Sequence, residues 1–228
     1  MLGTIVNGVA ILIGGILGLF FRGRVIDRYN ETVMQGVGLA VILIGLKSAF
    51  ASDDLLLIII SLAVGGLLGE FFGIEARLEQ MGNWLEKKFS KNGSGISKGF
   101  VTASLIFCVG SMAIVGSMES GLTGNHTTLY AKSLLDGITS VVFAATMGLG
   151  VLFSSASVLI YQGAITLTAS VMKQFLLPEV VAQMTSVGGL LILSIGVNIL
   201  GMAKIKIGNL LPGIFIPLIY YIIRQMFS

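Results

Sequence analysis

Three charged residues and one amide lie close together in the middle of the chain, between two apolar stretches. Lys132 and Asp136 are four positions apart, so a helix places both side chains on one face. Glu119 ends the preceding apolar stretch, and Asn125 lies between it and the pair. Two carboxylates beside a lysine can bind a cation or relay a proton. The same residues also fit an interfacial ion pair and a helix cap, so both interpretations stay open.

Hydroxyl and amide side chains are concentrated in the apolar stretches on either side of these charges. Polar groups are costly inside a bilayer, so those present are the first candidates for a functional role. Glycines beside Ser111 and Ser117 would interrupt a helix and expose carbonyl groups to a wet cavity, where irregular backbone is tolerated. We therefore predict a binding site for an ion or small polar solute made of the following residues: Ser111, Ser117, Glu119, Asn125, Lys132, Asp136, Thr139, Ser140 and Gln162.

The elements that must position these residues are long uncharged apolar stretches that recur along the chain. A run of roughly 18 or more apolar residues is long enough to cross the ~30 Å hydrocarbon core as a helix. Of the 228 residues, 55% are hydrophobic and 11% are charged, against about 25% charged in an average soluble domain. The sequence therefore predicts an all-α, polytopic transmembrane helical bundle. It forms one domain over residues 1–228, with about eight spans at 2–21, 33–50, 55–73, 99–118, 134–153, 155–177, 185–203 and 207–226.

Basic residues on the connections predict the orientation of the chain. Alternate connections carry ten Lys and Arg residues in one set (Arg22, Arg24, Arg28, Arg77, Lys87, Lys88, Lys91, Lys98, Lys204, Lys206) and four in the other (Lys47, Lys132, Lys173, Arg224). Cytoplasmic loops carry the excess of positive charge, so both termini are expected outside. No basic residue precedes the first apolar stretch, which is typical of a first membrane span and not of a cleaved signal peptide.

The connection at residues 74–98 is the one long polar segment. Its apolar residues recur at spacings of three and four, which predicts an amphipathic helix on the cytoplasmic surface with Trp84 as an anchor. A solvated linker helix fits the same pattern. If this segment carries the function, the protein is a non-transporting scaffold or sensor that partners another membrane complex. That is the alternative to transport.

The chain contains a faint internal repeat. Five residues of the second span recur in the seventh at an offset of 150: Met34, Val37, Gly38, Ile42 and Leu43 match Met184, Val187, Gly188, Ile192 and Leu193. Asn7-Gly8 in the first span lies roughly where Gln162-Gly163 lies in the sixth. Spans 1–3 and 6–8 would then be related and would cross the membrane in opposite directions. Inverted repeats of this kind recur in secondary transporters.

Other functional classes find little support in the sequence. The single cysteine, Cys108, excludes a cysteine metal cluster, and the single histidine, His126, has no partner for a metal site or hydrolytic triad. The net charge of +3 is too small for nucleic-acid binding. We expect no enzyme activity and no cofactor. The expected partners are membrane lipid, a small ion or polar solute, and further copies of the chain in a homo-oligomer.

Two pairs of glycines permit close contact between helices. Gly14 and Gly18, and likewise Gly65 and Gly69, are separated by three residues. Small residues at this spacing let helix backbones approach within a bilayer. The contact can lie within the bundle or between protomers.

Several segments resemble a known family. Gly121–Gly124, Ala131–Asp136, Phe143-Ala144 with Gly148, and Ser186–Leu191 are together similar to the YdfK/YqgA family of bacterial inner-membrane proteins, a domain of unknown function. The resemblance extends over essentially the whole chain. It implies a bacterial plasma-membrane protein of this size and span number, without known cofactor or catalytic residues. The family pattern has an Asp after the Thr-Gly pair where this chain has Asn125, which counts against an obligatory ion ligand at that position.

Overall fold

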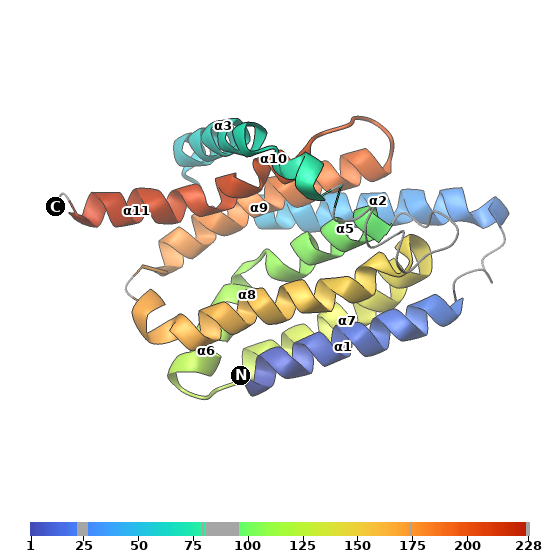
Figure 1. Cartoon of the computed structure of the whole chain (residues 1–228), viewed down its shortest axis with the longest axis horizontal. Coiled ribbons are helices and arrows are strands. Elements are labelled where there is room, and N and C mark those ends of the chain that lie inside the picture. Colours follow the sequence, from blue (N-terminus) through green and yellow to red (C-terminus); the bar gives the residue numbers. More distant parts are fainter. Residues whose placement is uncertain (22–26, 79, 81–95, 174, 227–228) are drawn as a thin grey trace.

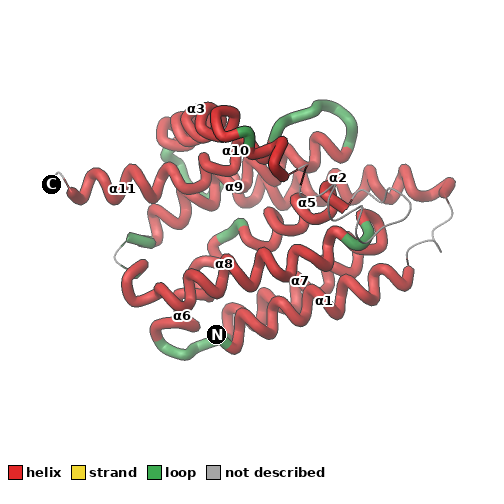
Figure 2. The backbone as a smooth tube through the Cα atoms, viewed as in Figure 1, coloured by secondary structure: helices red, strands yellow, loops and turns green. Residues whose placement is uncertain are grey.

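The computed structural model describes residues 1–21, 27–78, 80, 96–173 and 175–226, and these residues form helices and turns without a β-strand. Figure 2 shows the helices packed alongside one another. The predicted all-α helical bundle is confirmed. Its elements are α1 (Leu2–Phe21), α2 (Asp27–Ala49), α3 (Leu55–Phe72), α5 (Ile96–Cys108), α6 (Ser111–Leu122), α7 (Thr127–Met147), α8 (Gly150–Met172), α9 (Pro178–Ile199), α10 (Ile207–Leu210), the 3₁₀ helix η1 (Leu211–Phe215) and α11 (Ile216–Met226).

Five helical stretches among the described residues are long and apolar enough to cross a bilayer. They are α1, α3, most of α8, α9, and the stretch formed by α10, η1 and α11, with the bent pair of α5 and α6 as a sixth. In α2 the apolar part is the shorter segment Met34–Ala49, and α7 includes Lys132 and Asp136, which lower its hydropathy. The multi-pass membrane architecture is therefore supported, but the predicted count of eight spans is not confirmed.

The helix bounds agree with the sequence in some places and depart from it in others. The first and third spans, predicted at 2–21 and 55–73, are Leu2–Phe21 and Leu55–Phe72. In contrast, α2, α7 and α9 begin well before the predicted starts at 33, 134 and 185. The start of an apolar run predicts where the chain enters the hydrocarbon core, but the helix itself can begin several residues earlier. Pro178 occupies the first turn of α9, where its missing N–H has no intrahelical role.

Most of the predicted amphipathic segment at 74–98 lies outside the described residues, Trp84 included. Residues 74–78, directly after α3, are helical. A left-handed Gly73, with φ of 60°, separates them from α3. The predicted surface helix therefore stays a prediction for the rest of this segment.

The helices form a bundle whose outer surface is apolar. Figure 1 shows α3, α10 and α11 along one side, α1 and α7 along the opposite side, and α9 between them. Large apolar side chains of the outer helices are exposed, including Ile13 and Ile16 on α1 and Leu67 and Phe71 on α3. An apolar surface of this extent would be unfavourable in water. It is the surface expected of a bundle whose helices face lipid.

Glycines set the closest helix contacts inside the bundle. A Cβ atom at Gly14 or Gly18 of α1 would overlap backbone carbonyl groups of α7. A Cβ at Gly65 or Gly69 of α3 would overlap the backbone of η1 or of α10. Both glycine pairs therefore serve contacts within the bundle, one of the two roles that the sequence left open.

Two membrane-length helices are interrupted near their middles. The axes of α5 and α6 differ in direction by 59°, and Gly110, with φ of 132°, lies at the break. This is the interruption that the Gly110-Ser111 pair suggested. The second interruption is η1, where Pro212 has no N–H to donate and Gly213 packs against the carbonyl of Ser61.

The two chain ends lie apart in the bundle. Figure 1 shows the N-terminus beside the connection between α6 and α7, near the middle of the view, and the C-terminus at its left edge. The amino group of Met1 donates to Ser120 Oγ in α6 at 3.4 Å. That both termini face the outside of the membrane stays a prediction.

Candidate polar binding site between α1, α7 and α8

A charged pair is buried inside the bundle. Lys132 Nζ donates to Asp136 Oδ2 at 2.6 Å and to Oδ1 at 2.8 Å, within one turn of α7. Both residues are only 6% exposed. Because α7 begins at Thr127, the two residues lie roughly 8 and 14 Å along the helix. The pair is therefore inside the bundle and not at the outer mouth, where the predicted span starting at 134 placed it.

The face of α7 that carries the pair follows a helical repeat. Its buried positions recur at spacings of three, four and one (Leu129, Lys132, Ser133, Asp136, Ser140, Phe143, Ala144 and Met147). Such a stripe faces the interior of a helical protein. Lys132 and Asp136 are part of this stripe, so the same pattern that packs α7 brings two charges into the core. Pairing the two charges offsets part of the free-energy cost of burying each of them.

An amide on α1 completes the contact with the pair. Asn7, which is fully buried, donates through Nδ2 to Asp136 Oδ2 at 3.0 Å and to Gln162 Oε1 of α8 at 3.4 Å. The backbone of α1 can approach α8 because Gly8 has no Cβ; a Cβ there would overlap Leu159 of α8. We call Asn7, Lys132, Asp136 and Gln162 the buried polar cluster.

Hydroxyl groups extend this polar seam in both directions. Thr4 Oγ1 of α1 lies 3.4 Å from Thr166 Oγ1 of α8. Ser140 Oγ of α7 donates to the carbonyl of Ile11 in α1 at 3.1 Å and to that of Gly137 at 2.8 Å. The seam therefore continues along α1 on both sides of the buried polar cluster.

Three buried side-chain atoms in the described part of the chain have no hydrogen-bond partner. They are Asn7 Oδ1, Gln162 Nε2 and Ser117 Oγ, from three helices that pack against one another. A buried polar atom without a partner costs roughly 1–3 kcal/mol. Two of the three atoms belong to the buried polar cluster. The cluster therefore retains hydrogen-bonding capacity that the described side chains do not use.

The remaining predicted site residues do not contact the buried polar cluster. Glu119 is half-buried and accepts from Thr128 Oγ1 at 2.6 Å, while Asn125 is exposed. Asn125 Oδ1 accepts from the backbone N–H of Thr127 at 3.1 Å, which supports the first turn of α7. The sequence placed Glu119 and Asn125 close to Lys132 and Asp136. In the structure α7 instead carries Lys132 and Asp136 inward, away from Glu119.

Two further predicted residues have other placements. Thr139 donates to the carbonyl of Leu135 on its own helix at 2.7 Å, on the outward side of α7. Ser111 begins α6, and its side chain lies outside the described part. Asn7 is not among the predicted site residues. The signal for it in the sequence is that it is an amide within the first apolar stretch, matched to Gln162 in the weak repeat.

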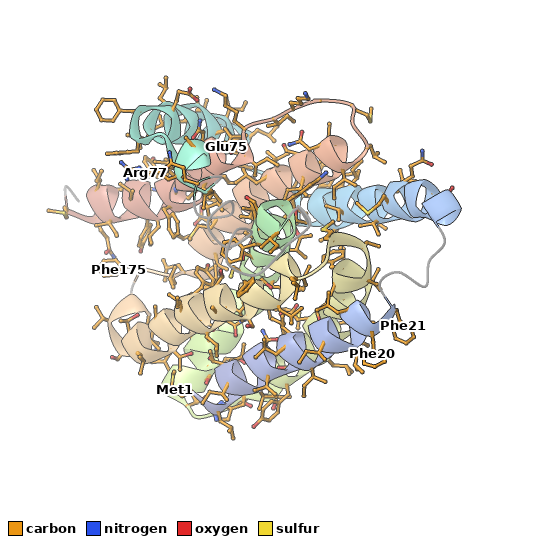
Figure 3. All side chains as sticks on the ribbon, turned by 45° about the vertical axis from the view of Figure 1, so that its right-hand side comes forward. Met1, Phe20, Phe21, Glu75, Arg77 and Phe175 are labelled. Atoms are coloured by element: carbon orange, nitrogen blue, oxygen red, sulfur yellow. The ribbon has the colours of Figure 1, made fainter. Side chains whose placement is uncertain are left out.

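A second polar cluster lies where the helical turn after α3 meets α10, and Figure 3 labels Glu75 and Arg77 on this turn. Glu75 Oε2 accepts from the backbone N–H of Gly208 at the start of α10. Asn209 is buried; it donates to Glu70 Oε2 and accepts from the backbone N–H of Glu75. Lys206 and Glu70 form an ion pair at 3.0 Å with both side chains about two-thirds exposed. Solvent and salt screen an exposed pair of this kind, so it contributes little to stability.

Cavities border both the second cluster and the helix breaks. Two crevices of about 520 and 560 Å³ share Glu75, Lys98, Asn198 and Ile205 in their walls. A smaller apolar cavity of about 190 Å³ is lined by residues from both interrupted helices, including Gly110 and Leu211. Within the described residues no group of three His, Cys, Asp or Glu side chains is placed to hold a metal ion.

Comparison with known proteins places the chain in a family. Residues 2–222 match the family described as "Protein of unknown function (DUF554)". The chain belongs to this family. It is 39% identical over 232 aligned residues to "Uncharacterized membrane protein YdfK" of Bacillus subtilis (strain 168), covering 100% of this chain and 99% of that protein. It is 28% identical over 223 residues to "Uncharacterized protein YqgA" of Escherichia coli (strain K12), covering 96% and 95%. No solved structure matches the chain significantly. The resemblance seen in the sequence is confirmed, and with it the membrane-protein class.

Proposed function

We propose that this protein is a small secondary transporter or channel-like protein for an ion or small polar solute. The observation that carries the proposal is the buried polar cluster, in which Lys132 and Asp136 lie inside a membrane bundle and two amide atoms lack partners. Ionisable residues within membrane segments are expensive and mark ion and solute pathways or proton relays. The path would follow the polar seam between α1, α7 and α8.

The proposed architecture is an inverted repeat of α1–α3 and α8–α11. Support comes from three antiparallel helix pairs. Gly8 and Gly15 of α1 contact Leu159 and Leu152 of α8, and Gly38 and Gly45 of α2 contact Gly196 and Gly189 of α9. Gly65 and Gly69 of α3 contact Gly213 of η1 and Asn209 of α10. Each pair joins two spans that the sequence repeat matches. Asn7 and Gln162, which the repeat also matches, are bonded to each other. A pseudo-two-fold axis in the membrane plane relates the halves of many transporters.

The two interrupted helices give further support. Many transporters use discontinuous membrane helices whose broken ends meet near the bilayer midplane. Here both breaks border one cavity, which lies against Tyr161 of α8, one residue before Gln162. The break at Gly110 would give α6 freedom to move relative to α5.

The same proposal covers partners and chemistry. The exposed apolar helix faces would contact membrane lipid, and copies of the chain would associate through them into a homo-oligomer in the bacterial plasma membrane. We propose transport without enzymatic activity. His126 Nδ1 lies 2.9 Å from Ser120 Oγ, but the amino group of Met1 also contacts that hydroxyl, which disfavours its activation as a nucleophile.

Flux through reconstituted protein tests the proposal. We expect liposomes holding the protein to take up at least one of sodium, potassium, chloride, nitrate or a neutral amino acid faster than empty liposomes. Lys132→Gln and Asp136→Asn should each change that flux by about tenfold or more, since each alters a charge-assisted bond worth roughly 1.5–3 kcal/mol. Thr139→Val, which removes a hydroxyl from the outward side of the same helix, is the matched control and should leave the flux unchanged. The proposal fails if no tested solute moves, or if the two cluster variants behave like the control.

The proposed orientation has its own test. In a Cys108→Ser background, we expect Asn125→Cys to react with a membrane-impermeant maleimide added to intact cells. Lys204→Cys should react only after the cells are permeabilised, because its connection belongs to the lysine-rich set. Both positions are exposed, so a difference in labelling reports the side of the membrane. The opposite labelling pattern would reverse the orientation, and equal labelling would place both connections on one side.

A further inference from the structure

The hydrogen bonds of the buried polar cluster leave three N–H groups without an acceptor among the described residues. Within the described part of the chain, the ammonium group of Lys132 donates only to the two oxygens of Asp136, which leaves one of its three N–H groups unused. Gln162 Nε2 has two unused N–H groups, and Asn7 Oδ1 is the one acceptor atom among the four side chains that has no partner in the described structure. The three unused N–H groups can donate to a partner that accepts hydrogen bonds.

We infer that the buried polar cluster binds a small monovalent anion together with a proton. This inference rests on the proposed transport function and names its substrate class. The proton binds to Asp136, which then releases Lys132. The anion takes the place of the carboxylate beside the ammonium group and accepts from Gln162 Nε2. No covalent bond other than the O–H of the protonated carboxyl forms, and the charges of proton and anion cancel.

The charge balance of the site favours this pairing. In the unloaded form one ammonium and one carboxylate sum to zero. After loading, the ammonium faces the anion and the carboxyl is neutral, so the sum is again zero. A net charge inside a bilayer is costly, and both of these forms avoid it. A sodium or potassium ion entering instead would leave the site with one uncompensated positive charge, because Lys132 already neutralises Asp136.

The other ionisable groups near α7 leave this balance unchanged. Cys108 of α5 interacts electrostatically with both members of the pair, and Tyr161 of α8 interacts with Cys108. Thiol and phenol groups are ordinarily neutral below about pH 8. The other charged side chains that the structure describes on helices packed against α7 do not bond to the pair. Glu119 of α6 bonds to Thr128, and Lys98 of α5 and Lys47 of α2 are exposed. The polar residues that α1 and α8 contribute, Asn7, Thr4 and Gln162, do not titrate.

Coupled flux in liposomes tests the inference. Liposomes would hold the wild-type protein and a pH-sensitive dye, with the voltage clamped by potassium and valinomycin. We expect an inward chloride or nitrate gradient to acidify the interior, and an acidic exterior to accelerate uptake of the same anion. Sulfate, a divalent anion, is the control and should not acidify the interior. Acidification driven by sodium in place of the anion, or anion uptake indifferent to external pH, would overturn the inference.

Two isosteric variants separate the anion from the proton. Asp136→Asn keeps a neutral side chain in place of the protonated carboxyl, so we expect chloride or nitrate binding, measured by calorimetry in detergent, to persist and become independent of pH. Lys132→Gln removes the charged donor and should weaken anion binding by about tenfold to a hundredfold. Thermal unfolding of each variant verifies that it is folded. The inference is overturned if Asp136→Asn abolishes anion binding or Lys132→Gln leaves it intact.

The outcomes distinguish this inference from the proposed function. Flux of a cation or neutral solute that depends on Lys132 and Asp136, without anion binding, would sustain the transporter and overturn the anion–proton assignment. Absence of flux for every tested solute, together with absence of anion binding, would overturn both. Binding of the anion to wild-type protein without any flux would overturn transport and leave a pH-linked anion site.

Discussion

Replacing Lys132 by methionine is expected to lower the free energy of unfolding by about 3–5 kcal/mol, the range found when one partner of a buried ion pair is removed. Lys132 and Asp136 are both only 6% exposed, and the ammonium group is the one cationic partner of the carboxylate in the described structure. Methionine has a similar length, so the substitution removes the charge and little volume. Equilibrium unfolding of the purified protein in mixed micelles measures the loss.

The double variant Lys132→Met with Asp136→Leu provides the control. Replacing a buried ion pair by apolar residues of similar volume is often neutral or stabilising by 1–4 kcal/mol. We therefore expect the double variant to be more stable than Lys132→Met alone, with a large coupling energy in the double-mutant cycle. If the two single effects simply add, the pair is not buried as described. A double variant that is stable but moves no solute would show that the pair is retained for function.

The sequence predicted the architecture well because bilayer physics permits few alternatives. Long uncharged stretches such as 2–21 and 55–73 can cross hydrocarbon only as helices or barrel strands, and they are too long and regular for strands. The start of α7 was missed because hydropathy counts Lys132 and Asp136 as separate charges. In the bundle they neutralise each other at 2.6 Å, and the helix continues past them. Pairing depends on tertiary structure, which a hydropathy pattern does not contain.

The candidate site was predicted in part for a related reason. Hydroxyl residues are concentrated in the middle of the chain, but Thr139, Thr146 and Thr168 donate to carbonyl groups of their own helices. A hydroxyl satisfied in this way can face lipid, so its presence does not mark a polar path. Asn7 and Gln162 lack that local option in this structure and meet between α1 and α8. Which amide faces inward is decided by helix rotation, and in the sequence the spacing of small residues in α1 is a sign of that rotation.

The packing of α3 against α10 and η1 should be the most sensitive helix contact outside the buried polar cluster. We expect Gly69→Ala to destabilise the protein by about 3 kcal/mol, the upper end of the usual cost of overpacking. A Cβ at this position would overlap the backbone carbonyl of Asn209, and backbone cannot rotate away as a side chain can. Displacing Asn209 would also disturb its bonds to Glu70 and Glu75.

Gly66→Ala is the matched control for this prediction, since it adds the same methyl group to the same helix. A Cβ at Gly66 lies 3.3 Å from Leu210 Cδ2, the end of a flexible side chain, and meets nothing else within 4 Å. Alanine is favoured over glycine by up to about 1 kcal/mol in a helix interior, so this variant should be neutral or slightly stabilised. Unfolding of both variants in mixed micelles measures the difference. Equal effects would mean that α3 does not approach α10 as closely as described, and the antiparallel pairing that supports the inverted repeat would lose one of its three contacts.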